Sequence, residues 1–169
     1  MTACILVLAL LAAPQQSPPP AEIPAPSEWV EFSADVRGQG PDGPFEGKFY
    51  RGADGSTRKE MTQVGGTITR IVITNLTRGE QYTCVKTCGT RPIKMPTTPP
   101  RMRSHPGMKK LDKPFEGFEG YVWESGTTST VIPALNFFAV EMMSTGLFEK
   151  YSNIRLGKQP SSLFEKPQQ

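Results

Sequence analysis

Short runs of alternating apolar and polar residues recur along this chain, and Gly or Asp-Gly turns close most of them. In segment 28–38, apolar side chains at the even positions alternate with polar ones. A period of two places the apolar residues on one face of a β-strand. Segment 67–75 (TITRIVITN) is the strongest strand signal, because it combines β-branched apolar residues with Thr. The pattern predicts a mainly β fold with little helix.

Further runs of this kind predict more strands, joined by short turns. They cover 45–51, 57–63, 81–84, 91–95, 115–125, 127–132, 136–143 and 147–156. Short turns lead us to expect consecutive strands to pair as an antiparallel meander. Apolar residues on both faces of 115–125 favour a central strand there, and Pro133 leaves a short helix as the rival interpretation of 136–143. We expect a single curved antiparallel sheet that forms an open half-barrel, with 161–164 packing back near the C-terminus.

The N-terminal region differs from the rest of the chain. Residues 1–13 (MTACILVLALLAA) form an apolar run that is too short to span a bilayer and resembles the core of a signal peptide. A buried strand is the alternative interpretation, but the Pro/Gln-rich stretch 14–27 separates this run from everything downstream and predicts a solvated tether. We therefore expect an exported protein, periplasmic or secreted, without a transmembrane span in the mature chain. Its single domain covers 28–167.

Export leaves two cysteines, Cys84 and Cys88, in the mature chain. Their spacing differs from the two-residue gap of thioredoxin-like motifs, and no second pair completes a zinc site. A three-residue hairpin loop at 85–87 would bring the two cysteines within disulfide reach. We expect a structural disulfide, with two free thiols, or a redox or metal role, as the alternatives.

Composition and charge argue against several classes of function. The net charge is +3, and the basic residues are scattered along strands and turns rather than gathered with aromatic residues as in nucleic-acid-binding proteins. Segment 96–114 is a basic, Pro-rich stretch that we expect to be a long loop over the sheet. Its basic residues include Arg101, Arg103, Lys109 and Lys110. His105, the single histidine, lies in this loop, so no Ser or Cys nucleophile has a base beside it in the pattern. We predict a protein that is not an enzyme and has no metal or cofactor.

The chain carries many large apolar residues but offers no long amphipathic helix to cover them. The sheet therefore either curls and packs shut, or leaves its inner face open to an apolar ligand. The candidate residues for an open, ligand-binding face are Phe32, Phe49, Ile71, Ile73, Tyr82, Trp123 and Phe137.

Segment 151–167 (YSNIRLGKQPSSLFEKP) resembles the ending of small exported proteins related to the periplasmic lipoprotein carriers, the LolA-like half-barrel proteins. In these proteins a last strand of the form x-N-I-x-x-G is followed by Q-P-x-x-L-F-x-x-P, and the upstream elements come in a similar order. The resemblance implies an unclosed antiparallel barrel whose concave side holds acyl chains. The carriers cover that cavity with helices, whereas this sequence places a basic Pro-rich loop there.

Two hypotheses follow from the sequence. In the first, the protein is an exported binding protein that holds a lipid or a lipid-modified protein on the concave face, with the basic loop near an anionic head group. In the second, it is a structural or interaction module of the cell envelope that has a closed core, holds no small-molecule ligand and binds a protein along a strand edge.

Overall fold

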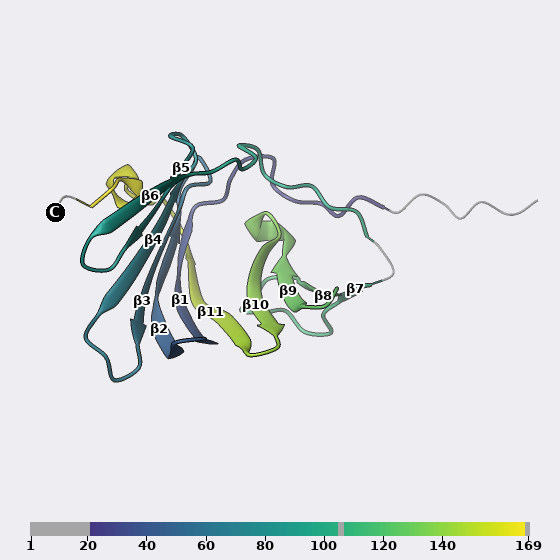
Figure 1. Cartoon of the computed structure of the whole chain (residues 1–169). Helices are drawn as coiled ribbons and strands as arrows, with labels where there is room; N and C mark the ends of the chain where they lie inside the picture. The colour runs from purple at the N-terminus through teal and green to yellow at the C-terminus, as the bar shows by residue number, and fades with distance from the viewer. Residues whose placement is uncertain (1–20, 105–106, 168–169) are drawn as a thin grey trace, which may run out of the picture.

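A computed structural model describes residues 21–104 and 107–167 of the chain. The predicted signal peptide at 1–13, the first part of the predicted tether and His105 lie outside the described residues. The described residues form one antiparallel sheet of eleven strands, with two 3-10 turns as its helical elements (Figure 1). The strands are β1 (Phe32–Gly40), β2 (Gly43–Arg51), β3 (Thr57–Gln63), β4 (Thr69–Asn75), β5 (Glu80–Cys84), β6 (Cys88–Pro92), β7 (Met108–Lys110), β8 (Tyr121–Glu124), β9 (Thr128–Ile132), β10 (Phe138–Ser144) and β11 (Leu147–Leu156). The turns are η1 (Pro133–Leu135), between β9 and β10, and η2 (Ser161–Phe164), after β11.

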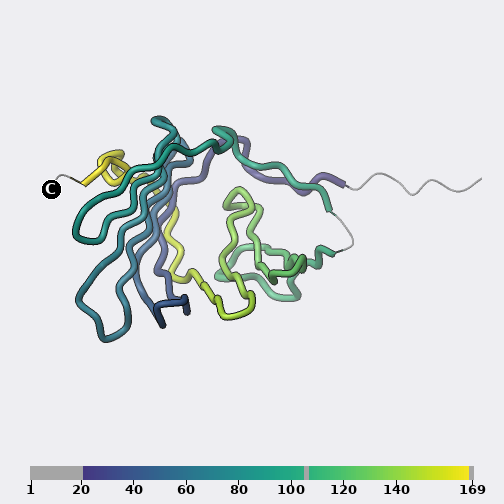
Figure 2. The backbone as a smooth tube through the Cα atoms, in the orientation of Figure 1, coloured from purple at the N-terminus to yellow at the C-terminus, as the bar shows by residue number. Residues whose placement is uncertain are grey.

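The order of strands in the sheet is β6-β5-β4-β3-β2-β1-β11-β10-β9-β8-β7. The first strand, β1, lies in the middle of the sheet. From there the chain runs outward to β6, crosses to the far edge at β7 and returns to the middle (Figure 2). The expected meander is present within each half, and the first and last strands join the halves through pairs such as Val36 with Tyr151. The sheet is not closed, because β6 and β7 remain as its two edges. The prediction of a mainly β, open antiparallel sheet with little helix is confirmed.

Two local predictions were wrong. Segment 115–125 is not a central strand, because Phe115 and Phe118 pair with each other across a tight turn in which Glu116 and Gly117 have positive φ. Only Tyr121–Glu124 forms a strand there, and it lies next to the edge strand. That edge strand, β7, lies inside the predicted loop 96–114. The strand predicted at 136–143 is confirmed as β10, which begins at Phe138. The short 3-10 turn η1 ends before it, because Asn136 and Phe137 both have positive φ.

The N-terminal segment from Ala21 onward is packed against the fold, so the prediction of a solvated tether is wrong for this part. Ile23 is buried, and its backbone N–H donates to the Met102 carbonyl at 3.0 Å. The N–H of Ser104 donates to the Ala21 carbonyl at 2.9 Å. An extended Pro-rich segment needs few apolar residues when it pairs with another extended segment, since the backbone supplies the hydrogen bonds.

The main core lies between the two halves of the sheet. The rings of Phe32, Phe49, Phe138 and Tyr151 contact one another with centroids 4.7–5.5 Å apart. Tilted and edge-to-face contacts of this kind stabilise a core beyond the area that they bury. These rings fill one part of the interior with side chains.

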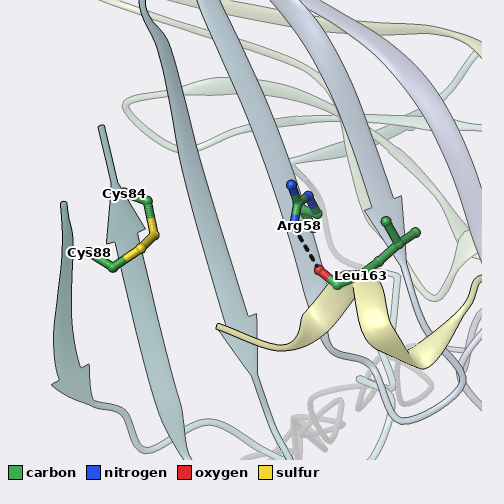
Figure 3. The surroundings of a disulfide bond; sticks show 4 residues. All are labelled: Arg58, Cys84, Cys88 and Leu163. Atoms are coloured by element: carbon green, nitrogen blue, oxygen red, sulfur yellow. Dashed lines mark hydrogen bonds between the residues drawn. A yellow bond between two sulfur atoms is a disulfide. The ribbon is translucent and has the colours of Figure 1, made fainter. Parts of the chain in front are cut away.

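A second core lies on the other face of β4 and β5. Phe49 pairs with Lys59, and Lys59 with Val72, so Ile73, one residue later, points to the opposite face. There Ile73 packs with Tyr82 and with Phe164 of η2. Hydrogen bonds hold η2 in place: Arg58 donates to the Leu163 carbonyl at 3.2 Å (Figure 3), and Asn75 donates to the Phe164 carbonyl at 3.0 Å.

Candidate ligand-binding groove

A groove of about 660 Å³ opens at one end of the sheet, between strands of its two halves. In Figure 1 this end is the lower end of β1, β2 and β3. The apolar lining includes Phe45, Met61, Ile68, Val85, Met142 and Leu147. The charged lining consists of Asp42, Lys59, Arg70 and Glu149. The groove therefore combines an apolar wall with a few charged groups, as small-molecule sites do.

Gly38 allows the strands around the groove to come close together. A Cβ atom at Gly38 would lie 2.3 Å from the Phe148 carbonyl oxygen and 2.6 Å from the nearest atom of the Phe45 ring. Both distances are shorter than van der Waals contact, so a side chain here would push β11 or the Phe45 ring away. The absence of a side chain at Gly38 sets the position of the Phe45 ring in the groove wall.

Three polar groups meet where the groove borders the aromatic core. The Lys59 ammonium and the Tyr151 hydroxyl both donate to the Glu149 carboxylate. The Lys59 Nζ also lies 5.4 Å from the centroid of the Phe45 ring. Burial, and then the nearby Glu149 carboxylate, raise the pKa of Tyr151 well above its usual range. Tyr151 therefore stays protonated at neutral pH and acts as a hydrogen-bond donor.

A second charged pair lies at the rim of the groove. The Arg70 guanidinium is 3.1 Å from the Asp42 carboxylate, and both side chains are more than half exposed. An exposed ion pair of this kind contributes only about 0–1 kcal/mol to the free energy of unfolding. An anion in the groove could therefore replace Asp42 as the partner of Arg70 at little cost.

Arg51 is a buried charge that holds the two halves of the sheet together. Its side chain is 3% exposed and donates to the carbonyls of Val30 at 2.9 Å and Leu135 at 2.7 Å. Its guanidinium carbon lies 4.6 Å from the Phe32 ring centroid and 5.6 Å from that of Phe138. Within the described part of the chain no carboxylate pairs with it. Burial lowers the pKa of Arg51 to about 10, so it still carries its charge at neutral pH.

Asn136 completes this anchor from the other half of the sheet. It has φ 53°, and its side-chain N–H₂ donates to the carbonyls of Pro26 at 3.1 Å and Glu28 at 2.9 Å. Its side-chain oxygen accepts from the Val30 N–H at 2.8 Å and from Arg51 at 3.2 Å. The anchor fixes η1 and the start of β10 against the start of β1.

The predicted apolar face is divided among different parts of the molecule. Phe32 and Phe49 belong to the filled aromatic core, whereas Ile73 and Tyr82, with Ile71 beside them, lie under η2 on the other face. Phe137 packs with Ile23 in a third cluster, and Trp123 is half-buried in β8 opposite Met108 and Ser129. None of these seven predicted residues is part of the groove lining.

The predicted basic residues also lie away from the groove. Arg101 is 3.9 Å from the Glu22 carboxylate, and Arg103 forms a backbone bridge with the same residue. Lys109 and Lys110 belong to β7, where Lys110 pairs with Glu119 at 2.9 Å. The structure thus brings these residues to the N-terminal segment and the far edge of the sheet.

Cys84 and Cys88 form a disulfide between β5 and β6, with their Cα atoms 4.0 Å apart (Figure 3). The predicted three-residue loop 85–87 and the disulfide are confirmed, although the second strand starts at Cys88 rather than near 91. The disulfide borders the second core, because Cys84 packs there with Ile73 and Tyr82. The loop that it closes carries Val85, which lines the groove.

Sequence reasoning missed both the groove lining and the anchor. The signal for Arg51 was present, since it falls on the same face of its strand as Phe45 and Phe49. A charge on an apolar face indicates a buried hydrogen-bonded group. The groove lining gave no such signal, because it combines apolar, polar and charged residues from several strands and turns that are distant in the sequence.

Within the described residues, no three His, Cys, Asp or Glu side chains gather in a way that could hold a metal ion. In the same part of the chain, no helix has the length and apolar character needed to cross a bilayer. The sequence matches no protein-family model and no curated protein. The resemblance to the LolA-like proteins therefore stays a prediction.

Proposed function

We propose that this chain is an exported, non-enzymatic binding protein that holds an apolar chain, such as the acyl group of a lipid, in the groove. The observation that carries the proposal is the groove itself, whose volume of about 660 Å³ is within the range of roughly 300–1,000 Å³ of small-molecule sites. Its wall includes the flexible side chains of Met61 and Met142 and the ring of Phe45. Methionine adapts its shape to flexible apolar ligands.

The charged groups of the lining support a ligand with a polar end. Arg70 lies at the rim in an exposed pair, and Lys59 lies deeper against Glu149. Fatty acids and phospholipids combine an apolar chain with an anionic group, which Arg70 would accept at the rim. The disulfide supports export, because such bonds persist in oxidising compartments.

The alternative, a cell-envelope module with a closed core, has one observation in its favour. The rings of Phe32, Phe49, Phe138 and Tyr151 fill the part of the interior beyond Lys59. The ligand that we propose therefore occupies the open part of the interior alone, which favours a single chain over a bulky lipid.

Binding of a fluorescent fatty acid to the purified mature protein tests the proposal. Met61→Trp puts a larger side chain into the groove, and we expect affinity to fall at least about tenfold. Met95→Trp is the matched control, because Met95 is 54% exposed and does not line the groove. Thermal unfolding of both variants is the control that they are folded.

Native mass spectrometry with added palmitate or phospholipid gives a second measurement. Bound lipid in the wild-type protein, but not in Met61→Trp, is the expected result. Protein that stays empty with every lipid, and that leaves a dye such as ANS dark, would refute the proposal and support a closed core.

A further inference from the structure

Exposed apolar side chains gather at one end of the molecule. Among the described residues, seven large apolar side chains are 48–61% exposed. Five of them lie at the end where the groove opens, and two, Met95 and Leu156, lie elsewhere. The five are Val64, Ile68, Val85, Met143 and Leu147.

The strand order explains why these residues meet. In an antiparallel sheet every second turn lies at the same end. The turns after β1, β3, β5, β8 and β10 share one end, and this end includes the segments 39–43, 64–68, 85–87, 125–127 and 143–147. We call this surface the mouth end. Ile68, Val85 and Leu147 come from three different turns and line the same groove, so they stand around its opening.

The mouth end has very few charges. In its five segments only Asp42 and Lys86 are charged, although 21% of the whole chain is Asp, Glu, Lys or Arg. Asp42 is already paired with Arg70. The turns at the opposite end carry more charges, among them Asp54, Arg78 and Lys158. Apolar tips with so few charges form a surface that enters an apolar phase with little desolvation cost.

We propose that the mouth end docks onto the lipid surface of a membrane, with its apolar turn tips inserted among the lipids. The five apolar side chains stand on three separate turns, and Gly, Ser and Thr separate the two apolar residues of one turn. A rigid protein partner needs a continuous complementary area of about 800 Å² on each side, whereas fluid lipid surrounds each tip separately. The groove opens at this end, so docking would place its opening at the lipid surface. Docking does not require an occupied groove, and it goes beyond the proposed function.

Flotation of the mature protein with vesicles of pure phosphatidylcholine tests this contact. Val64→Ser with Met143→Ser removes two tips that do not line the groove, and vesicle partitioning should fall at least about tenfold. Met95→Ser with Leu156→Ser is the matched control, because these residues are equally exposed but lie outside the mouth end. The control should partition like the wild-type protein.

Two further conditions identify the surface that binds. Because the mouth end has few charges, adding salt or phosphatidylglycerol should change partitioning less than twofold. Met61→Trp should still bind vesicles even though it loses fatty acid, so failure of docking and failure of the proposed function are distinguishable. Equal partitioning of the two double variants would overturn the docking proposal. Vesicle binding that needs anionic lipid and disappears in salt would also overturn it. A protein that does not bind vesicles, and instead self-associates through Val64 and Met143, would overturn it as well.

Discussion

The buried Arg51 gives the sharpest test of how the two halves of the sheet are held. Arg51→Met keeps an unbranched apolar stem and removes the charge, whereas Arg51→Lys keeps the charge and removes the planar guanidinium. Chemical similarity would rank Lys as the milder change. The structure predicts the reverse order, because two carbonyls and two rings surround a single guanidinium.

The magnitudes follow from these contacts. A pKa of about 10 for Arg51 implies that burying its charge costs roughly 3 kcal/mol, which Arg51→Met recovers. The same variant leaves the Val30 and Leu135 carbonyls without their donor, which lowers the free energy of unfolding by about 1–3 kcal/mol for each carbonyl. It also loses the cation–π contact of the guanidinium with the Phe32 and Phe138 rings, worth about 2 kcal/mol. We expect a net loss of about 3 kcal/mol. Arg51→Lys keeps a buried charge, so it does not recover the cost of burying one, and its ammonium cannot reach both carbonyls. We therefore expect the free energy of unfolding to fall by about 4 kcal/mol or more.

Urea unfolding at pH 7, with linear extrapolation to water, measures both variants. Arg37→Met and Arg37→Lys are the controls, because Arg37 is an exposed arginine on the neighbouring strand, and both should stay within about 0.5 kcal/mol of the wild-type protein. An Arg51→Lys protein that is as stable as Arg51→Met, or more so, would refute the reasoning. It would mean that the charge rather than the planar guanidinium holds η1 in place.

Three further predictions concern stability. Intact mass after alkylation without reduction should reveal no added groups on Cys84 or Cys88, and two alkylated thiols would contradict the disulfide. The double Ser variant of these cysteines should fold, but its free energy of unfolding should be lower by about 2 kcal/mol. Phe164→Ala should cost about 3 kcal/mol in urea unfolding, since its ring is buried, and an unchanged midpoint would mean that η2 is detached in solution. Burial, and then Glu149, raise the pKa of Tyr151 above its value in the unfolded chain, which is about 10. The contribution of this shift to the free energy of unfolding is therefore fully present below about pH 10 and is lost as the pH rises further. Tyr151→Phe should therefore lose less stability than the wild-type protein between about pH 9 and 11, and equal losses would contradict the assignment.

Local patterns predicted the elements of the fold well. The strands at 57–63 and 147–156, and the C-terminal turn at 161–164, lie where alternation and turn residues predicted them. The disulfide also followed from a local property, the length of one hairpin loop. The pairing of β1 with β11 did not, because it joins distant segments and no local pattern records it.

The candidate site was harder to predict for the same reason. Phe49 and Ile73 are both apolar residues on predicted strands, but the register across β2, β3 and β4 sends them to opposite faces. Ile23 looked solvated because its partner Met102 is distant in sequence. The groove lining depends on which turns share an end of the sheet. That property belongs to the topology rather than to any one segment.

The central seam between β1 and β11 has a consequence for the order in which the protein forms during synthesis. Asn153 donates to Asp35, 118 residues earlier, so β1 waits for its second neighbour until almost the whole chain has been made. Each half contains only short-range pairings and can form early, whereas the seam must form last and slows folding. If the chain is exported, as we propose, this delay is useful, because a polypeptide that has not yet closed its seam is easier to unfold for passage through a translocation pore.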